Sequence, residues 1–116
     1  MRISNSEELK AKLDRGDNLK LVMTLNEWAY RAKHIPGSIY VASQEQVPGL
    51  LQLDDEIIVY CTNPACSASI IAYEALRAQG FTNVARYPGG IQEWEEAGYP
   101  VVSEYQNNKR EETSHA

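Results

Sequence analysis

The two cysteines of the chain, Cys61 and Cys66, are its strongest candidates for chemistry. Cys61 directly follows the apolar, mostly β-branched run 57–60, which is typical of a parallel strand covered on both faces. After a short loop, helical periodicity begins near Ile70 and ends at Gly80, which suits the left-handed position after a helix. We therefore expect Cys61 at the carboxyl end of a strand, facing the N-terminus of a helix.

This position favours a reactive role for Cys61. Open α/β sheets bind their ligands at the carboxyl ends of the strands. Unpaired amide groups and the positive end of a helix dipole stabilise an anion, so a thiol held there loses its proton readily and becomes a nucleophile. The alternative is that Cys61 is a small buried hydrophobe, but its place between two elements favours the functional interpretation.

Length and charge restrict the class of protein. A chain of 116 residues predicts one domain, and a net charge of −5 argues against nucleic acid or an anionic membrane as the main partner. The polar start and the lack of an apolar run of about 20 residues predict a soluble, cytoplasmic protein. Paired cysteines in that compartment are more often catalytic or metal-binding than disulfide-bonded. With only His34 and His115 as further soft ligands, we expect no metal and no other cofactor.

Strands and helices alternate along the chain, which predicts one parallel sheet covered on both faces. A capping box of Ser4 and Glu7 is expected to start the first helix, and Asn26 to cap a short second one. Trp94 is expected in the core. The expected elements are a helix over 5–14 ending near Gly16, a strand over 19–24, a turn over 34–37, a strand over 38–41, a short irregular segment over 44–53, a strand over 81–87 and a helix over 91–97 ended by Gly98.

The domain is expected to span residues 1–102. Residues 103–116 are polar and contain almost nothing apolar to bury, so they are expected to form a disordered C-terminal tail.

Four sequence segments, in this order, resemble the rhodanese-like domains, and together they cover nearly the whole chain. They are His34-Ile35-Pro36-Gly37, Val59-Tyr60-Cys61 before a loop and helix, Gly80-Phe81-Thr82-Asn83-Val84, and the segment 89–101, which begins Gly89-Gly90-Ile91. The resemblance implies an α/β fold with a five-stranded parallel sheet flanked by helices on both faces. It also implies a sulfurtransferase in which Cys61 accepts a sulfane sulfur, becomes a persulfide and passes the sulfur to a nucleophile.

The loop after Cys61 is the expected cradle for this persulfide. Its outer sulfur is anionic, and a semicircle of backbone amides suits an anion. Hydroxyl groups of Thr62, Ser67 or Ser69 could add to the amides, although Ser67 could equally be a helix cap. The loop consists of Thr62, Asn63, Pro64, Ala65, Cys66 and Ser67, of which Pro64 has no amide hydrogen.

The chain departs from the family pattern in its charges. Many members carry Asp-Val-Arg after the first strand and an arginine in the loop, whereas this chain has Met23-Thr24-Leu25 and no basic residue over 62–66. We therefore expect weak activity with thiosulfate, a thiol persulfide or polysulfide as the small donor, and a thiol, either small or on a protein, as acceptor. In this family the histidine matched by His34 is chiefly a turn residue.

Two other functions remain open. A non-catalytic rhodanese-fold binding or redox-sensing module could switch Cys61 and Cys66 between dithiol and disulfide, and Cys66 could be a resolving cysteine or simply core packing. The spacing of Cys61, Cys66 and Ser67 also resembles low-molecular-weight phosphatases and arsenate reductases. Their loop arginine is missing here, which makes that reading the weaker one.

Overall fold

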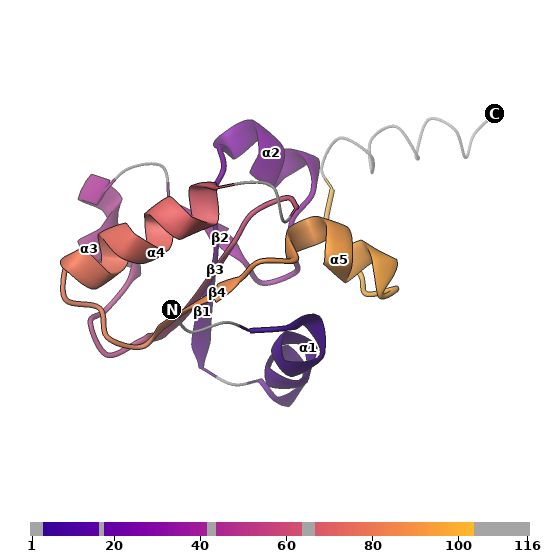
Figure 1. Cartoon of the computed structure of the whole chain (residues 1–116), viewed down its shortest axis with the longest axis horizontal. Helices are drawn as coiled ribbons and strands as arrows, with labels where there is room; N and C mark the ends of the chain where they lie inside the picture. Colours follow the sequence, from indigo (N-terminus) through magenta and orange to yellow (C-terminus); the bar gives the residue numbers. More distant parts are fainter. Residues whose placement is uncertain (1–3, 17, 42–43, 64–66, 104–116) are drawn as a thin grey trace.

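Parallel strands form the centre of the structure (Figure 1). The computed structural model describes residues 4–16, 18–41, 44–63 and 67–103. Within them the strand order is β2-β1-β3-β4. The strands are β1 (Leu19–Met23), β2 (Ile39–Tyr40), β3 (Glu56–Tyr60) and β4 (Val84–Tyr87).

The strand before Cys61 is the most deeply buried, as its apolar sequence predicts. Residues 57–60 of β3 are each 0% exposed. Their side chains alternate between two cores: Ile58 and Tyr60 contact one, and Ile57 and Val59 contact the other. The continuous apolar run is therefore explained by a strand with helices on both sides.

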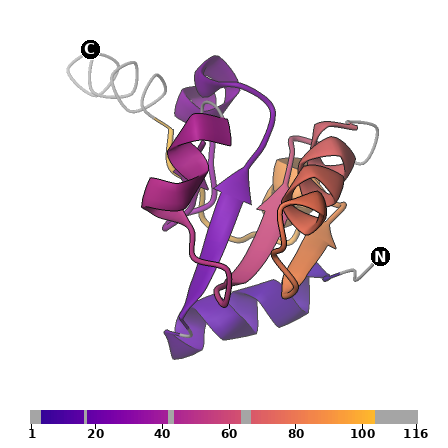
Figure 2. The ribbon, with the colours of Figure 1, turned by 90° about the vertical axis from the view of Figure 1, so that its left-hand side faces the viewer.

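The helices form two layers around the sheet (Figures 1 and 2). Leu9, Ala29 and Trp94 pack into the core on one face, and Val47 and Leu76 into the core on the other. Trp94 is 1% exposed, so its predicted core position is confirmed. The first layer contains α1 (Ser6–Arg15), α2 (Glu27–Ala32) and α5 (Gly90–Glu96), and the second contains α3 (Val47–Leu50), which follows a short 3-10 turn (Gln44–Gln46), and α4 (Ala68–Ala78).

The N-cap of the first helix lies one residue later than predicted. Asn5, and not Ser4, caps α1, because its side-chain oxygen accepts a hydrogen bond from the Glu8 amide at 2.8 Å. Ser4 is instead buried, and its amide donates to the Arg86 carbonyl at 2.9 Å. The cap predicted at Asn26 is confirmed by a 2.7 Å bond from the Ala29 amide.

The five-stranded sheet implied by the family resemblance is wrong for the described residues, which form four strands. The outer edge of β4 shows the reason. Ser4 bonds there to Arg86, but Asn5 already caps α1, so the described chain turns into a helix before it can pair further.

The remaining boundaries differ from expectation by a few residues. The segment predicted over 38–41 pairs as a strand only at Ile39–Tyr40, and the last strand begins at Val84 instead of residue 81. Gly16 and Gly98 end their helices with φ of 75° and 84°, as predicted. Among the described helices, none is both long and apolar enough to cross a membrane.

Candidate functional site

Cys61 lies directly after β3 and is 2% exposed, at the carboxyl end of the sheet as predicted. The preceding carbonyl, that of Tyr60, is held by the neighbouring strand end: the Thr24 amide and hydroxyl both donate to it, at 3.0 and 2.9 Å. The Thr62 hydroxyl oxygen lies 3.9 Å from the Cys61 Sγ. One of the predicted hydroxyl groups is thus next to the sulfur, and the strand end that carries the sulfur is fixed.

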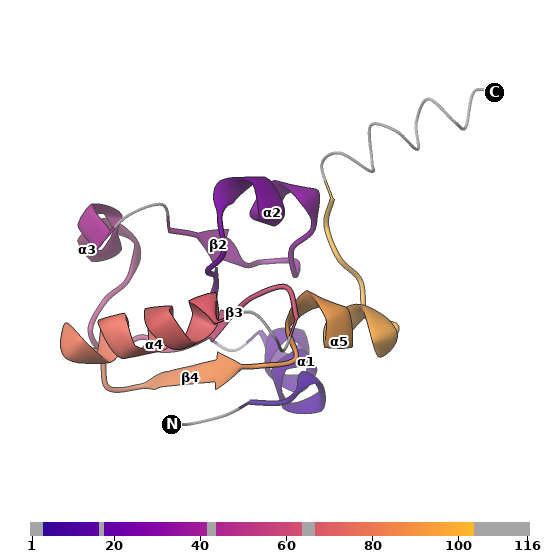
Figure 3. The same cartoon turned by 45° about the horizontal axis from the view of Figure 1, so that its top comes forward.

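The start of α5 binds the backbone that leaves Cys61 (Figure 3). The Ile91 amide donates to the Cys61 carbonyl at 3.1 Å, and the Gln92 amide donates to the Thr62 carbonyl at 2.9 Å. In a trans peptide the carbonyl and the following N–H point in opposite directions. The amides of Thr62 and Asn63 therefore point away from α5, and within the described residues the Thr62 amide donates no hydrogen bond.

Gly90 makes this contact possible. Its φ is +63°, and a Cβ placed on it would lie 2.4 Å from the Cys61 carbonyl oxygen. Only a residue without a side chain permits this backbone conformation together with this approach. The sequence marked Gly90 as part of a family segment and as the opening of a helix, but not as a contact of Cys61, because the contact joins segments far apart in the chain.

The α4 side of the loop is described from Ser67 onward. Ser67 occupies the N-cap position of α4, makes no side-chain cap hydrogen bond, and its carbonyl accepts from the amides of Ile70 and Ile71. Thr62, Asn63 and Ser67 are thus placed at the two ends of the predicted cradle. The other predicted members, Pro64, Ala65 and Cys66, lie outside the described residues.

Arg86 brings a positive charge to this region that the loop sequence lacks. Its Nε donates to the hydroxyl of Ser69, which is 1% exposed in the first turn of α4, at 2.8 Å. Arg86 pairs with Val59, two residues before Cys61, on the α4 face of the sheet. With about 4.8 Å between strands and about 3.3 Å per residue along them, the Cα atoms of Arg86 and Cys61 lie about 8 Å apart. The sequence held one signal for this role of Arg86, since it is a charged residue inside an otherwise apolar strand.

Tyr60 holds the turn over 34–38 against the end of β3. Its hydroxyl accepts from the Ile35 amide at 3.1 Å and lies 2.7 Å from the Ser38 hydroxyl. Burial raises the pKa of Tyr60 above its ordinary value, against the smaller lowering by these bonds. His34 Nδ1 lies 2.7 Å from the Tyr30 carbonyl, and its backbone pairs with Val102, which agrees with a turn residue.

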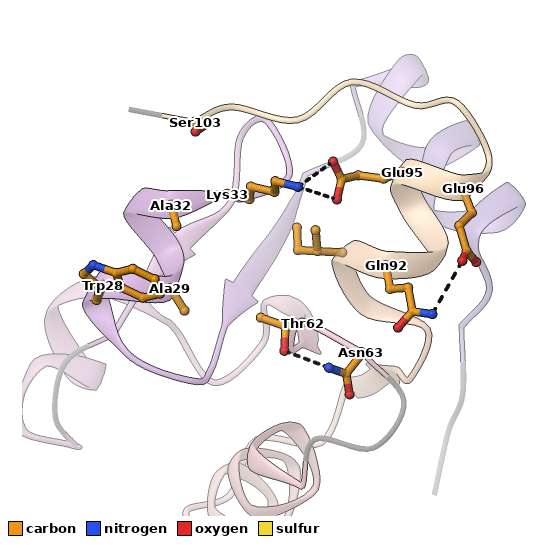
Figure 4. A pocket seen from close by; sticks show the side chains of 11 residues that line it. Trp28, Ala29, Ala32, Lys33, Thr62, Asn63, Gln92, Glu95, Glu96 and Ser103 are labelled. Carbon is orange, nitrogen blue, oxygen red and sulfur yellow. Dashed lines mark hydrogen bonds and ion pairs between the residues drawn. The ribbon is translucent and has the colours of Figure 1, made fainter. Parts of the chain in front are cut away.

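A pocket of about 570 Å³ opens beside the first loop residues (Figure 4). Thr62 and Asn63 form one part of its lining, between α2 and α5. Trp28 lies on the α2 side and is 69% exposed. Lys33 ends α2, and its Nζ reaches α5, where it binds both carboxylate oxygens of Glu95 at 3.1 Å. The other lining residues are Ala29, Ala32, Ile91, Gln92, Glu96 and Ser103.

The fold and this arrangement define a class of protein: a parallel α/β domain with a cysteine at the carboxyl end of a central strand, followed by a loop that leads to a helix. The sequence profile of the rhodanese-like domain matches residues 5–97. The chain therefore belongs to the rhodanese-like domain family, as its sequence segments indicated.

Solved structures support the same fold. The BH2092 protein of Bacillus halodurans superimposes with a TM-score of 0.82 at 25% identity, covering 89% of this chain and 77% of that one. A rhodanese-related protein of Thermoplasma volcanium gives 0.71 at 27%, covering 88% and 98%. A thiosulfate sulfurtransferase of Pseudomonas aeruginosa gives 0.74 at 24%, covering 89% of this chain but 20% of that protein. No curated protein matches the chain.

Proposed function

We propose that the protein is a sulfurtransferase that carries a sulfane sulfur on Cys61 as a persulfide and passes it to a thiol. The observation that supports this most is the contact of α5 with the Cys61 and Thr62 carbonyls. It turns the following amides away from α5, and such amides stabilise the anionic outer sulfur of a persulfide. A cysteine used only for packing needs no such cradle.

The two half-reactions balance without an external oxidant. In the first, the Cys61 thiolate attacks the sulfane sulfur of the donor, a new S–S bond forms, and the donor leaves with the electron pair of the broken bond. In the second, an acceptor thiolate attacks the outer sulfur of the Cys61 persulfide, and the electron pair of that S–S bond returns to Cys61. The sulfane sulfur keeps its oxidation state throughout.

A thiol persulfide or polysulfide is the proposed donor. Thiosulfate is a dianion, and its recognition requires cations that are not already engaged. Among the described residues around this site, Lys33 is neutralised by Glu95, which leaves the single charge of Arg86, whose Nε donates to the Ser69 hydroxyl, to face a dianion. We therefore expect low turnover with thiosulfate at any ionic strength.

The test is sulfur loading followed by intact mass measurement. Reduced wild-type protein is incubated with polysulfide, freed of small molecules, and measured for a mass gain of one sulfur and for cyanolysable sulfur. The Cys61→Ser variant should carry neither, whereas Cys66→Ala, which keeps Cys61, should load normally. Stoichiometric cyanolysable sulfur on Cys61→Ser would contradict the assignment.

A further inference from the structure

Trp28 is the most exposed of the large hydrophobic side chains in the part of the chain that the structure describes. It is 69% exposed and lies on α2, where it lines the pocket between α2 and α5 together with the apolar side chains of Ala29, Ala32 and Ile91. Large aromatic side chains contribute strongly to interfaces, because each buries much apolar surface. An exposed tryptophan beside other apolar side chains therefore marks a contact surface.

The C-terminal end of the described chain is fixed beside this surface. The Val102 amide donates to the His34 carbonyl at 2.8 Å, and the Val102 carbonyl accepts from the His34 amide at 2.9 Å, as an antiparallel bridge. Ser103 follows, is 4% exposed and lines the pocket (Figure 4). The description of the chain ends at Ser103, so the next residues start from the pocket lining itself.

The bridge also sets the direction of the chain. In an antiparallel pair, a residue that follows Val102 lies opposite one that precedes His34, so the chain leaves Ser103 toward the end of α2. Ala32, at that end, lies between Ser103 and Trp28 in Figure 4, and Trp28 is one helical turn before it. Two extended residues span about 7 Å and one helical turn about 5.4 Å, so the second residue after Ser103 comes within side-chain reach of Trp28.

That second residue is Tyr105, the only phenylalanine, tryptophan or tyrosine over 104–116. We propose that Tyr105 packs on Trp28, so that the start of the C-terminal segment covers the Trp28 side of the pocket. An offset or edge-to-face pair with ring centroids about 4.5–7 Å apart is the favoured arrangement, and the tyrosine hydroxyl group stays in water. This occupant is favoured over a separate molecule, because two residues after a fixed point give Tyr105 a high effective concentration at Trp28.

The experiment measures acrylamide quenching of Trp28 fluorescence in the full chain. The other tryptophan, Trp94, is 1% exposed, so the quenching reports on Trp28. In Tyr105→Ala the ratio of covered to uncovered Trp28 should fall about two- to tenfold, as expected for the loss of one aromatic pair. Tyr105→Phe keeps a ring and should retain the wild-type quenching. Gln106→Ala is the matched control, since it removes only the neighbouring polar side chain, and it should also quench as the wild type does.

A second measurement detects the contact directly. Tyr105→Phe, grown with ring-labelled phenylalanine, gives two phenylalanine signals, of which one belongs to Phe81, 4% exposed in the core on the α4 face. The other should show nuclear Overhauser effects to the Trp28 indole, and these should survive dilution.

Equal quenching of Trp28 in wild type and Tyr105→Ala, or the absence of these Overhauser effects, would overturn the inference. Overhauser effects that disappear on dilution would overturn it as well, because a second copy would then cover Trp28. Cys61 does not line this pocket, so sulfur loading should be equal in wild type and in all three variants. A wild-type chain that does not load would contradict the proposed function and leave the contact of Tyr105 with Trp28 standing.

Discussion

The substitution Gly90→Ala tests the contact between α5 and the Cys61 backbone, because the added Cβ would meet that backbone directly. Gly90 has φ +63°, and an added Cβ meets the Cys61 carbonyl oxygen at 2.4 Å and two further backbone atoms at 3.0 Å. The left-handed conformation costs about 1–2 kcal/mol for a residue with a Cβ. Displacing backbone that two hydrogen bonds hold adds about 1–2 kcal/mol. The free energy of unfolding should therefore fall by about 2–4 kcal/mol, which lowers Tm by about 10–20 °C in a domain of this size.

Gly49→Ala is the matched control. Gly49 lies in α3, has no positive φ, and an added Cβ would meet nothing within 4 Å. Its replacement should leave the free energy of unfolding unchanged or raise it by up to about 1 kcal/mol, because alanine favours a helix more than glycine does. Thermal unfolding gives the stability of both variants, and sulfur loading at a temperature where both are folded gives the effect on Cys61. Equal Tm and equal loading in the two variants would refute the role given to Gly90.

Three further perturbations test other parts of the site. Arg86→Gln, in a Cys66→Ala background, should slow alkylation of reduced Cys61 at neutral pH about two- to thirtyfold, since a unit charge at a separation similar to that of the two Cα atoms, about 8 Å, contributes about 0.5–2 kcal/mol. Arg77→Gln, at the far end of α4, should not slow it, and equal rates for Arg86→Gln and wild type would remove Arg86 from the site. Tyr60→Phe should cost about 1–3 kcal/mol of stability at neutral pH through its lost hydroxyl bonds. Because burial raises the pKa of Tyr60, its contribution is complete below pH 10 and is lost as the pH rises further, so the variant should show a shallower alkaline loss in denaturant titrations. If Cys66 is a resolving cysteine, Cys66→Ala should recover less activity than wild type after peroxide and dithiothreitol; equal recovery would leave it as packing.

Local signals predicted the elements well where a single interaction decides them. The apolar run 57–60 requires two covered faces, and Gly16 and Gly98 end their helices because each adopts a positive φ. The first cap was harder to predict, because Ser4 and Asn5 are both good caps next to each other in the sequence. The number of strands was taken from the family resemblance, and for the described residues it was wrong because α1 begins at once after Asn5.

The site was predictable only in part for a related reason. Cys61 follows from its own neighbours, since a strand that stops before a helix places the residue between them at the sheet edge. The partners of Cys61 do not follow in that way. Gly90 reaches the Cys61 carbonyl, and Arg86 reaches the first turn of α4, through the pairing of β3 with β4, so each depends on packing between distant segments.

Arg86 and α5 lie against the segment after β3 from different layers, and this separation predicts how their effects combine. Arg86 donates to Ser69 on the α4 face of the sheet. Gly90 begins α5, which packs on the other face and donates to the Cys61 and Thr62 carbonyls. Without a shared partner, the effects of Arg86→Gln and Gly90→Ala on the free energy of sulfur loading should add. The Arg86→Gln/Gly90→Ala double variant should therefore slow sulfur loading by the product of the two single losses. A loss well below that product would mean that both residues act on one group, and that the charge and the backbone contact are not separate contributions.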